Sequence, residues 1–161
     1  MKKFRISILA AVIAVLAAAT VASATATTKI AFTGKYTGQA STKVDGNVVD
    51  ISATGTGSGT LMGATKLSGA GTGDSSQQPC VPFGGTGKLV GAKSTTISYK
   101  VISGASGCGD EGGHVFSLKG YLTVTKATGK LARAKGKLKF TGVYDRDDGT
   151  FSVKFTGTLT K

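Results

Sequence analysis

The sequence predicts an all-β protein, in the form of a small antiparallel β-barrel of about eight strands, with a β-sandwich as the alternative. Apolar and polar residues alternate with period two along most of the chain after residue 24, which is typical of half-buried strands. Turn signals separate these short strands at frequent intervals. Glycines stand inside several strands, and we interpret them in favour of the barrel because glycine permits sharp curvature.

The first 24 residues are typical of a secretory signal peptide. Lys2, Lys3 and Arg5 precede an apolar run, and Ala22-Ser23-Ala24 fits the site that a signal peptidase cleaves. An uncleaved anchor is the less favoured alternative, because a spanning helix needs about 20 predominantly apolar residues and this run is shorter. We therefore expect cleavage after Ala24, removal of the signal helix, and a secreted, periplasmic or cell-surface protein.

Length, glycine content and charge indicate the domain number and the kind of partner for the remaining part of the chain. Removing residues 1–24 from the 161 leaves 137, which predicts a single β-barrel domain over residues 25–161. All 25 glycines lie there, without the Gly-X-Y period of collagen. The formal charge is +12 for the whole chain and +9 without the predicted signal peptide. For an exported protein, this charge predicts attraction to anionic lipids or envelope polymers, and export excludes intracellular nucleic acid as a partner.

The elements follow from the alternation and the turn signals. Strands are expected over residues 29–37, 43–44, 47–53, 83–90, 95–102, 115–125, 137–144 and 151–160. Asp45-Gly46 predicts a tight hairpin, since such a turn needs positive φ. We expect the glycine-rich run 54–59 to end a strand or to form a bulged edge, and we expect loops at 74–79 and 103–113.

Two cysteines, Cys80 and Cys108, lie at these two loops. An even number of cysteines in an oxidising compartment predicts one disulfide, which would tie the loops together. A metal or redox pair is less favoured, because the sequence has neither a CxxC motif nor a second cluster of ligands.

Short segments recur along the chain. Residues 86–93 resemble residues 128–135, with a fainter copy at 59–65, and residues 116–119 resemble residues 151–154. We interpret these short internal repeats as one supersecondary unit that occurs more than once.

The segment Gly84-Gly85-Thr86-Gly87-Lys88-Leu89-Val90-Gly91-Ala92 and its copy at 128–136 resemble a GGTGxFxGAxG turn-strand motif. That motif is similar to one in the small eight-stranded barrels of the allene oxide cyclase and dirigent type, and in many secreted bacterial proteins. The resemblance covers the second half of the mature chain and supports the fold more than the function. It implies an apolar barrel that guides reactive organic intermediates. No residue here matches the polar groups that act in those barrels.

The barrel interior is expected to be apolar, with no charged residue on the inward face of any predicted strand. The inward residues are expected to be Phe32, Tyr36, Ile51, Ile97, Tyr99, Leu118, Leu122, Phe140, Phe155 and Leu159. An eight-stranded barrel is just wide enough to be filled by side chains or to hold one small ligand. Few aromatic residues and many glycines predict some free space. We therefore expect weak uptake of a small lipophilic molecule without turnover.

No motif predicts catalysis, a metal site or a cofactor. His114 is the only histidine, and with Asp110 and Glu111 it does not supply the four N or S ligands of a structural zinc site. We expect it to be a solvated loop residue. Residues 145–149 depart from the spacing of a calcium loop and predict a polar hairpin turn.

Basic residues cluster over 14 positions that contain no acid: Lys126, Lys130, Arg133, Lys135, Lys137 and Lys139. Such a cluster either serves solubility and discourages edge pairing, or binds an anionic envelope polymer or lipid. The sequence thus predicts a non-enzymatic exported protein that binds an anionic surface component or a small lipophilic ligand. A cyclase-like or dirigent-like enzyme and a structural envelope protein are the alternatives.

Overall fold

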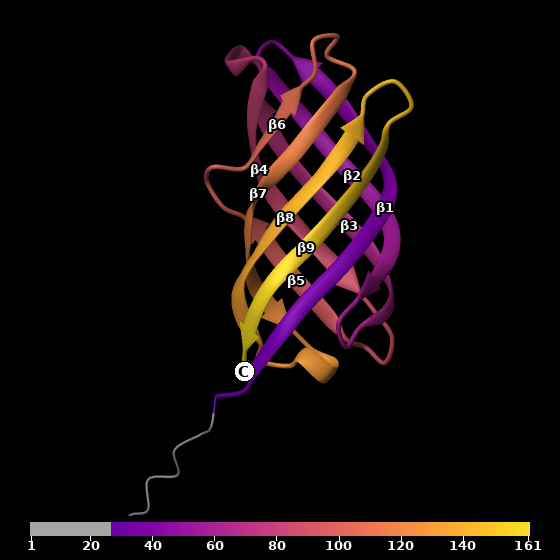
Figure 1. Cartoon of the computed structure of the whole chain (residues 1–161), viewed down its shortest axis with the longest axis vertical. Coiled ribbons are helices and arrows are strands. Elements are labelled where there is room, and N and C mark those ends of the chain that lie inside the picture. Colours follow the sequence, from indigo (N-terminus) through magenta and orange to yellow (C-terminus); the bar gives the residue numbers. More distant parts are fainter. Residues whose placement is uncertain (1–26) are drawn as a thin grey trace, which may run out of the picture.

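The structure, a computed structural model, describes residues 27–161, so the predicted signal peptide lies outside the described residues. In this part of the chain, nine antiparallel strands form one sheet that closes on itself as a barrel (Figure 1). The strands are β1 (Lys29–Asp45), β2 (Val48–Gly59), β3 (Gly63–Asp74), β4 (Cys80–Val90), β5 (Thr96–Val101), β6 (Ser106–Gly109), β7 (Val115–Ala127), β8 (Lys135–Asp145) and β9 (Thr150–Thr160). Two short 3-10 turns, η1 (Ser75–Gln77) and η2 (Gly129–Leu131), complete the described elements.

Closure of the sheet settles the choice between barrel and sandwich. The pairing of β3 with β4, from Lys66↔Val90 to Gly73↔Phe83, joins the two ends of the strand order. β5 and β6 both pair with β4 on one side and with β7 on the other, so they share one position in the wall. The barrel therefore has eight strand positions, as the sequence predicts.

Several segments differ from the sequence prediction, among them residues 38–42, which belong to β1 and join two expected strands. β3 is a full strand although its residues give no clear apolar alternation, because β2 and β4 supply backbone partners along nearly its whole length. The glycine-rich run 54–59 forms the end of β2, as one of the two predicted alternatives has it, and it stays in unbroken register with β1 and β3, so it is not a bulged edge. β6 forms a strand inside the predicted loop 103–113.

One of the two short internal repeats corresponds to equivalent positions in the fold. β7 and β9 flank β8 on either side, and the register aligns Phe116 with Tyr144 and Phe151 in one row. The other internal repeat is not a structural repeat. Residues 86–90 lie in β4, whereas the matching segment begins at Thr128 and forms η2 between β7 and β8.

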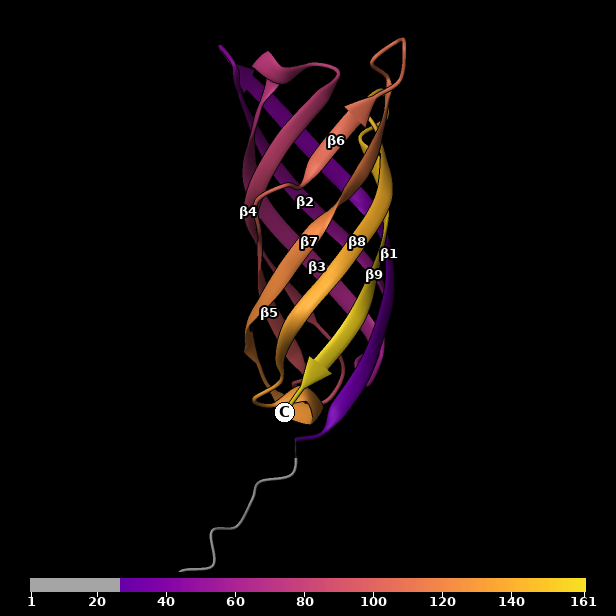
Figure 2. The ribbon, with the colours of Figure 1, turned by 60° about the vertical axis from the view of Figure 1, so that its left-hand side comes forward.

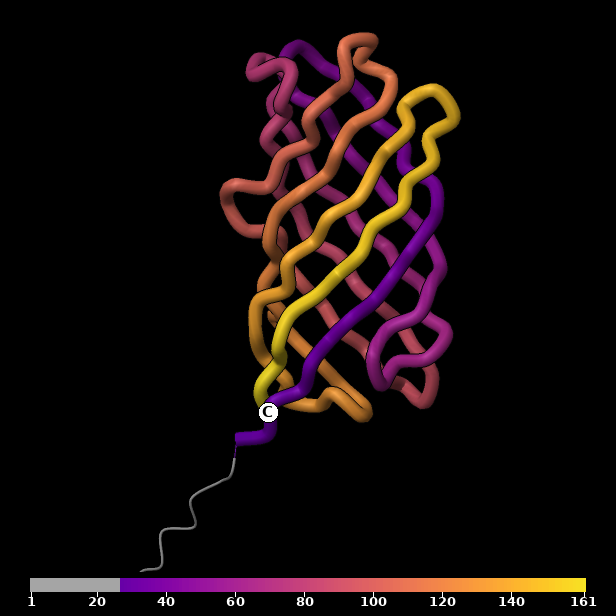
Figure 3. The backbone as a smooth tube through the Cα atoms, viewed as in Figure 1, coloured from indigo at the N-terminus to yellow at the C-terminus, as the bar shows by residue number. Residues whose placement is uncertain are grey.

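The barrel has two different ends (Figure 2). The closed end carries the turns at residues 60–62, 91–95 and 128–134, together with the start of β1 and the end of β9. The open end carries the β1–β2 hairpin at residues 46–47, η1, the β6–β7 loop at 110–114 and the β8–β9 turn at 146–149. The smooth trace shows these two sets of turns at opposite ends of the long axis (Figure 3).

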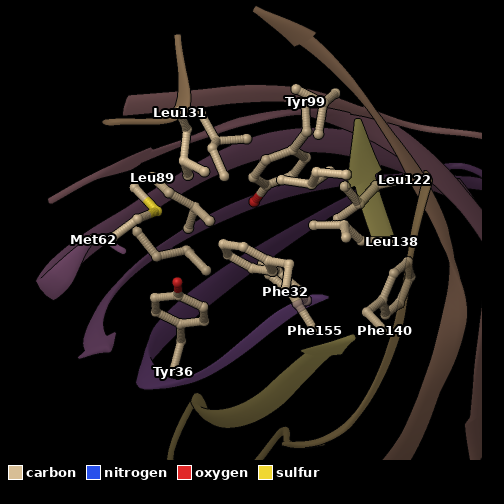
Figure 4. Packing of buried hydrophobic residues seen from close by; sticks show 14 of the residues in the cluster. Phe32, Tyr36, Met62, Leu89, Tyr99, Leu122, Leu131, Leu138, Phe140 and Phe155 are labelled. Atoms are coloured by element: carbon tan, nitrogen blue, oxygen red, sulfur yellow. The ribbon is translucent and has the colours of Figure 1, made fainter. Parts of the chain in front are cut away.

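Side chains fill the closed half of the barrel. Met62, Leu89 and Leu131 are fully buried and come from three different turns or strand ends, so they plug this end. Tyr36 packs beside Phe155, with ring centroids 5.3 Å apart (Figure 4). Gly34 faces the Tyr36 ring, and a Cβ atom added at Gly34 would lie 2.8 Å from that ring. Glycine inside a strand therefore makes room for an aromatic side chain here, a role that curvature alone does not explain.

Candidate functional site

The candidate site is a cavity of about 430 Å³ in the open half of the barrel. Its deepest lining residues are buried aromatic and aliphatic side chains that rest on the packed core, among them Leu122, Phe140 and Phe155. Thr42, Gln78 and other polar side chains line it near the open end. The packed half closes the cavity at one end, so a ligand would enter through the other.

Strand register explains why space remains in this half. Across β7, β8 and β9 the inward side chains form successive rows, which are Phe116–Tyr144–Phe151, Leu118–Gly142–Val153, Gly120–Phe140–Phe155 and Leu122–Leu138–Gly157. Each of the last three rows contains a glycine, so a row holds only two side chains where three could stand. In the closed half, Met62, Leu89 and Leu131 fill the interior, whereas no side chain between residues 27 and 161 plugs the open end in this way.

The lining is almost wholly uncharged. Of the side chains between residues 27 and 161 that line the cavity, Arg146 alone carries a charge, and it belongs to the β8–β9 turn at the mouth. Its backbone N–H donates to the carbonyl O of His114 at 2.8 Å, which anchors this turn to the neighbouring loop. The inward faces of the strands contribute only apolar and hydroxyl-bearing residues to the lining.

Two tyrosines, Tyr36 and Tyr99, point their hydroxyl groups into the barrel interior (Figure 4). Burial raises the pKa of Tyr99 to about 12, with a smaller contribution from Tyr36. Burial likewise raises the pKa of Tyr36 to about 12, which a nearby Thr65 hydroxyl partly offsets. That hydroxyl donates to the carbonyl O of Gly63 at 2.8 Å. The Tyr36 hydroxyl is buried and has no hydrogen-bond partner among the described residues. Both phenols are therefore neutral at physiological pH.

The predicted inward residues divide between the two halves of the barrel. Those that line the cavity are Ile51, Tyr99, Leu118, Leu122, Phe140 and Phe155. Phe32, Tyr36, Ile97 and Leu159 belong to the packed core. Sequence reasoning missed Leu67, because β3 was not predicted, and Val81, which stands just after Cys80. The alternation of Val81 and Phe83 around Pro82 was a signal for an earlier strand start.

Cys80 and Cys108 form the predicted disulfide. They are directly paired residues of β4 and β6, with Cα atoms 3.9 Å apart, so the bond joins two neighbouring strands and not two loops. It fixes short β6 to the wall, beside the cavity residues Val81 and Gly107. A disulfide also fits a protein of an extracellular or periplasmic compartment.

His114 lies at the open end with a carboxylate partner. Its Nδ1 is 2.8 Å from Oδ1 of Asp147, and its backbone N–H donates to Oδ1 of Asp110 at 2.9 Å. The hydrogen bond with Asp147 raises the pKa of the imidazole. His114 is exposed, as expected, but it links two open-end turns.

Residues 145–149 form a turn that its own carboxylates stabilise. Oδ1 of Asp145 accepts from the N–H of Asp147, and Oδ1 of Asp148 accepts from the N–H of Thr150. Between residues 27 and 161, no three His, Cys, Asp or Glu side chains gather as a metal site would require. The same part of the chain contains no helix that is long and apolar enough to cross a bilayer.

The six predicted basic residues lie on β7, on β8 and in the turn that joins these two neighbouring strands. Lys135, Lys137 and Lys139 are exposed on the outer face of β8. Lys130 and Arg133 lie in the closed-end turn that contains η2, and Lys126 lies near the end of β7.

No protein-family model matches this chain, and a search of the curated proteins found no match.

Proposed function

We propose that this protein binds one small lipophilic molecule in the open-end cavity of its barrel. The single observation that carries the proposal is the cavity itself, about 430 Å³ and lined mainly by apolar side chains. Ligand sites are typically apolar concavities of roughly 300–1,000 Å³ with a few polar groups that orient the ligand. At about 30 Å³ per water molecule, this volume corresponds to about 14 waters, which is room for a small lipid or aromatic compound.

The arrangement of polar groups suggests how such a ligand would lie. Its apolar body would rest against Leu122, Phe140 and Phe155, where contact removes apolar surface from water. A polar end would stay at the mouth, near Thr42, Gln78 and Arg146. An amphiphile with a short polar head therefore fits better than a uniformly polar metabolite.

Binding without turnover is the favoured activity. A general base must have a pKa near the working pH, and the buried tyrosines have pKa values of about 12. Among the described residues that line the cavity there is no carboxylate and no imidazole. The alternative is a cyclase-like or dirigent-like enzyme, which the motif at residues 84–92 implies. Chemical conversion of the bound compound would indicate such an enzyme.

We also propose that the protein is exported. The N-terminal pattern of Lys2, Lys3 and Arg5 before an apolar run supports export, and the Cys80–Cys108 disulfide fits an oxidising compartment. Intact-mass analysis of the protein from its native host tests this proposal. We expect a mature chain that begins at Thr25, whereas a full-length chain held in the membrane would contradict it.

The test of binding uses the dye N-phenyl-1-naphthylamine, whose fluorescence rises in an apolar environment. Val153→Trp should fill the cavity and weaken dye binding at least tenfold. Val143→Trp is the matched control, because Val143 is 44% exposed on the outer face of the neighbouring strand. Thermal unfolding of both variants verifies that they are folded. Equal dye binding by both would place the dye outside the cavity and contradict the proposal.

Competition by a medium-chain fatty acid and by the matching alcohol then tests the ligand class. We expect both to displace the dye and to be recovered unchanged by mass spectrometry. Failure of both to displace it would reject lipophilic amphiphiles as the ligand class.

A further inference from the structure

Charge is distributed unequally between the two ends of the barrel. All eight acidic residues of the chain lie at or near the open end: Asp45, Asp50, Asp74, Asp110, Glu111, Asp145, Asp147 and Asp148. The closed end carries basic residues only, namely Lys29, Lys93, Lys130, Arg133, Lys135 and Lys161. The closed end therefore has a strongly positive potential that no carboxylate of its own turns neutralises.

Backbone strain is concentrated at the same end. Four non-glycine residues of the described chain have positive φ, and all four lie in closed-end turns: Leu61 (62°), Lys93 (53°), Ser94 (55°) and Arg133 (67°). At the open end, the positive-φ positions are the glycines Gly46, Gly113 and Gly149. A side chain in this conformation costs free energy that glycine would avoid, and such outliers cluster at functional positions.

The strained residues present a particular combination of side chains. Leu61 is 46% exposed at the tip of the β2–β3 turn, while the next residue, Met62, is fully buried and plugs the barrel. Lys93 and Arg133 are exposed in the two other closed-end turns. The Met62 N–H donates to Gly59 O and its carbonyl accepts from the N–H of Ala92, so the turn that carries Leu61 is fixed to the turn that carries Lys93.

We propose that the closed end docks onto an anionic phospholipid bilayer. Leu61 enters the headgroup region, and Lys93, Lys130 and Arg133 contact lipid phosphates. The open end and its cavity then face away from the membrane, because its acidic turns are repelled by the same surface. An exposed apolar residue among basic residues favours a lipid surface as the partner, because the apolar side chain is buried in the bilayer while the basic side chains contact phosphates. A soluble polyanion would interact with the basic residues alone. This inference is independent of what the cavity binds.

The insertion of Leu61 can be measured with one fluorophore, because the sequence contains no tryptophan. Leu61→Trp is titrated, as the protein purified after export, with vesicles of phosphatidylglycerol and phosphatidylcholine. We expect a blue shift of its emission with these vesicles and none with phosphatidylcholine alone. Val48→Trp, at a position 49% exposed beside the open-end hairpin, is the control that should not shift. Equal shifts in both variants, or none in either, would overturn the proposal.

The charges are tested by two triple variants of equal net charge. Lys93→Gln/Lys130→Gln/Arg133→Gln removes closed-end charge, and vesicle affinity should fall about fivefold per charge, or about 100-fold in all. Lys43→Gln/Lys100→Gln/Lys119→Gln removes the same charge elsewhere and should have a much smaller effect. Equal losses would show binding by net charge without a docking end. Binding to heparin but not to vesicles would show a polyanion partner, which also overturns the proposal.

Discussion

At the scale of one residue, Leu61 is a position where the closed end does not carry the amino acid that its backbone conformation favours. Its φ of 62° is a conformation that glycine adopts freely and that a side chain makes unfavourable. The chain uses glycine at many positive-φ positions, including Gly63 two residues later. A side chain at position 61 therefore stands where the fold alone would favour its absence.

Leu61→Gly is accordingly expected to stabilise the protein by up to about 1 kcal/mol, since the relief of the side-chain clash exceeds the extra chain entropy of glycine. Urea unfolding measures the change. Leu61→Ala keeps the Cβ, so it should give no stabilisation. A loss of stability in Leu61→Gly would mean that the side chain holds the turn together.

His114 is the residue whose charge responds to pH near neutrality. The hydrogen bond to Asp147 raises its pKa above the ordinary 6.5. The pair therefore contributes stability that is fully present below pH 6.5 and is lost as the pH rises through the raised value. Both groups are exposed, which keeps this contribution small.

NMR titration of the imidazole Hε1 proton should therefore give a midpoint above 6.5, and Asp147→Asn should lower that midpoint. The assignment is unambiguous because the chain has one histidine. A midpoint at or below 6.5 in the unsubstituted protein would show that the pair does not form in solution.

At the scale of elements, β6 is the strand with the least support of its own. It has four residues and shares a wall position with β5, and the disulfide joins it to β4. Its pairing with β7 includes Gly107↔Leu118, next to the cavity. The bond therefore holds the part of the wall that the hydrogen-bond ladder holds least.

Cys80→Ala/Cys108→Ala should lower the free energy of unfolding by about 3.6 kcal/mol, the chain-entropy value for a loop of 28 residues. Urea unfolding of the double variant, and of the reduced unsubstituted protein, gives the same quantity by two routes. A decrease below about 1 kcal/mol by both routes would show that the strands hold this region without the bond.

The sequence could predict the elements with strong alternation but not those without it. β7, with Phe116, Leu118 and Leu122 on one face, follows from period two alone. β3 does not, because its strand state depends on β2 and β4, which lie beside it only after closure. Alternation also predicts that Phe32 and Phe140 face inward, but not that only Phe140 lines a cavity. That depth is set by the register between strands.

At the scale of the whole molecule, the two ends of the barrel differ in both charge and packing. One end is filled by Met62, Leu89 and Leu131 and is basic, and the other is open and acidic. Neither property follows from composition, because the net charge of the chain does not say where its eight acids lie. They follow from topology, which brings each acid-bearing turn to the same end.

Locating a bound lipophilic ligand tests most directly whether the open-end cavity is the binding site. Methyl NMR of the protein, titrated with a medium-chain alcohol, should show shifts for the cavity residues Ile51, Leu118 and Val153. The exposed, outward-facing Val90 and Val143 should not shift. Shifts confined to the outward methyl groups, or no shifts at saturating ligand, would contradict the proposal that this barrel is a ligand-binding container.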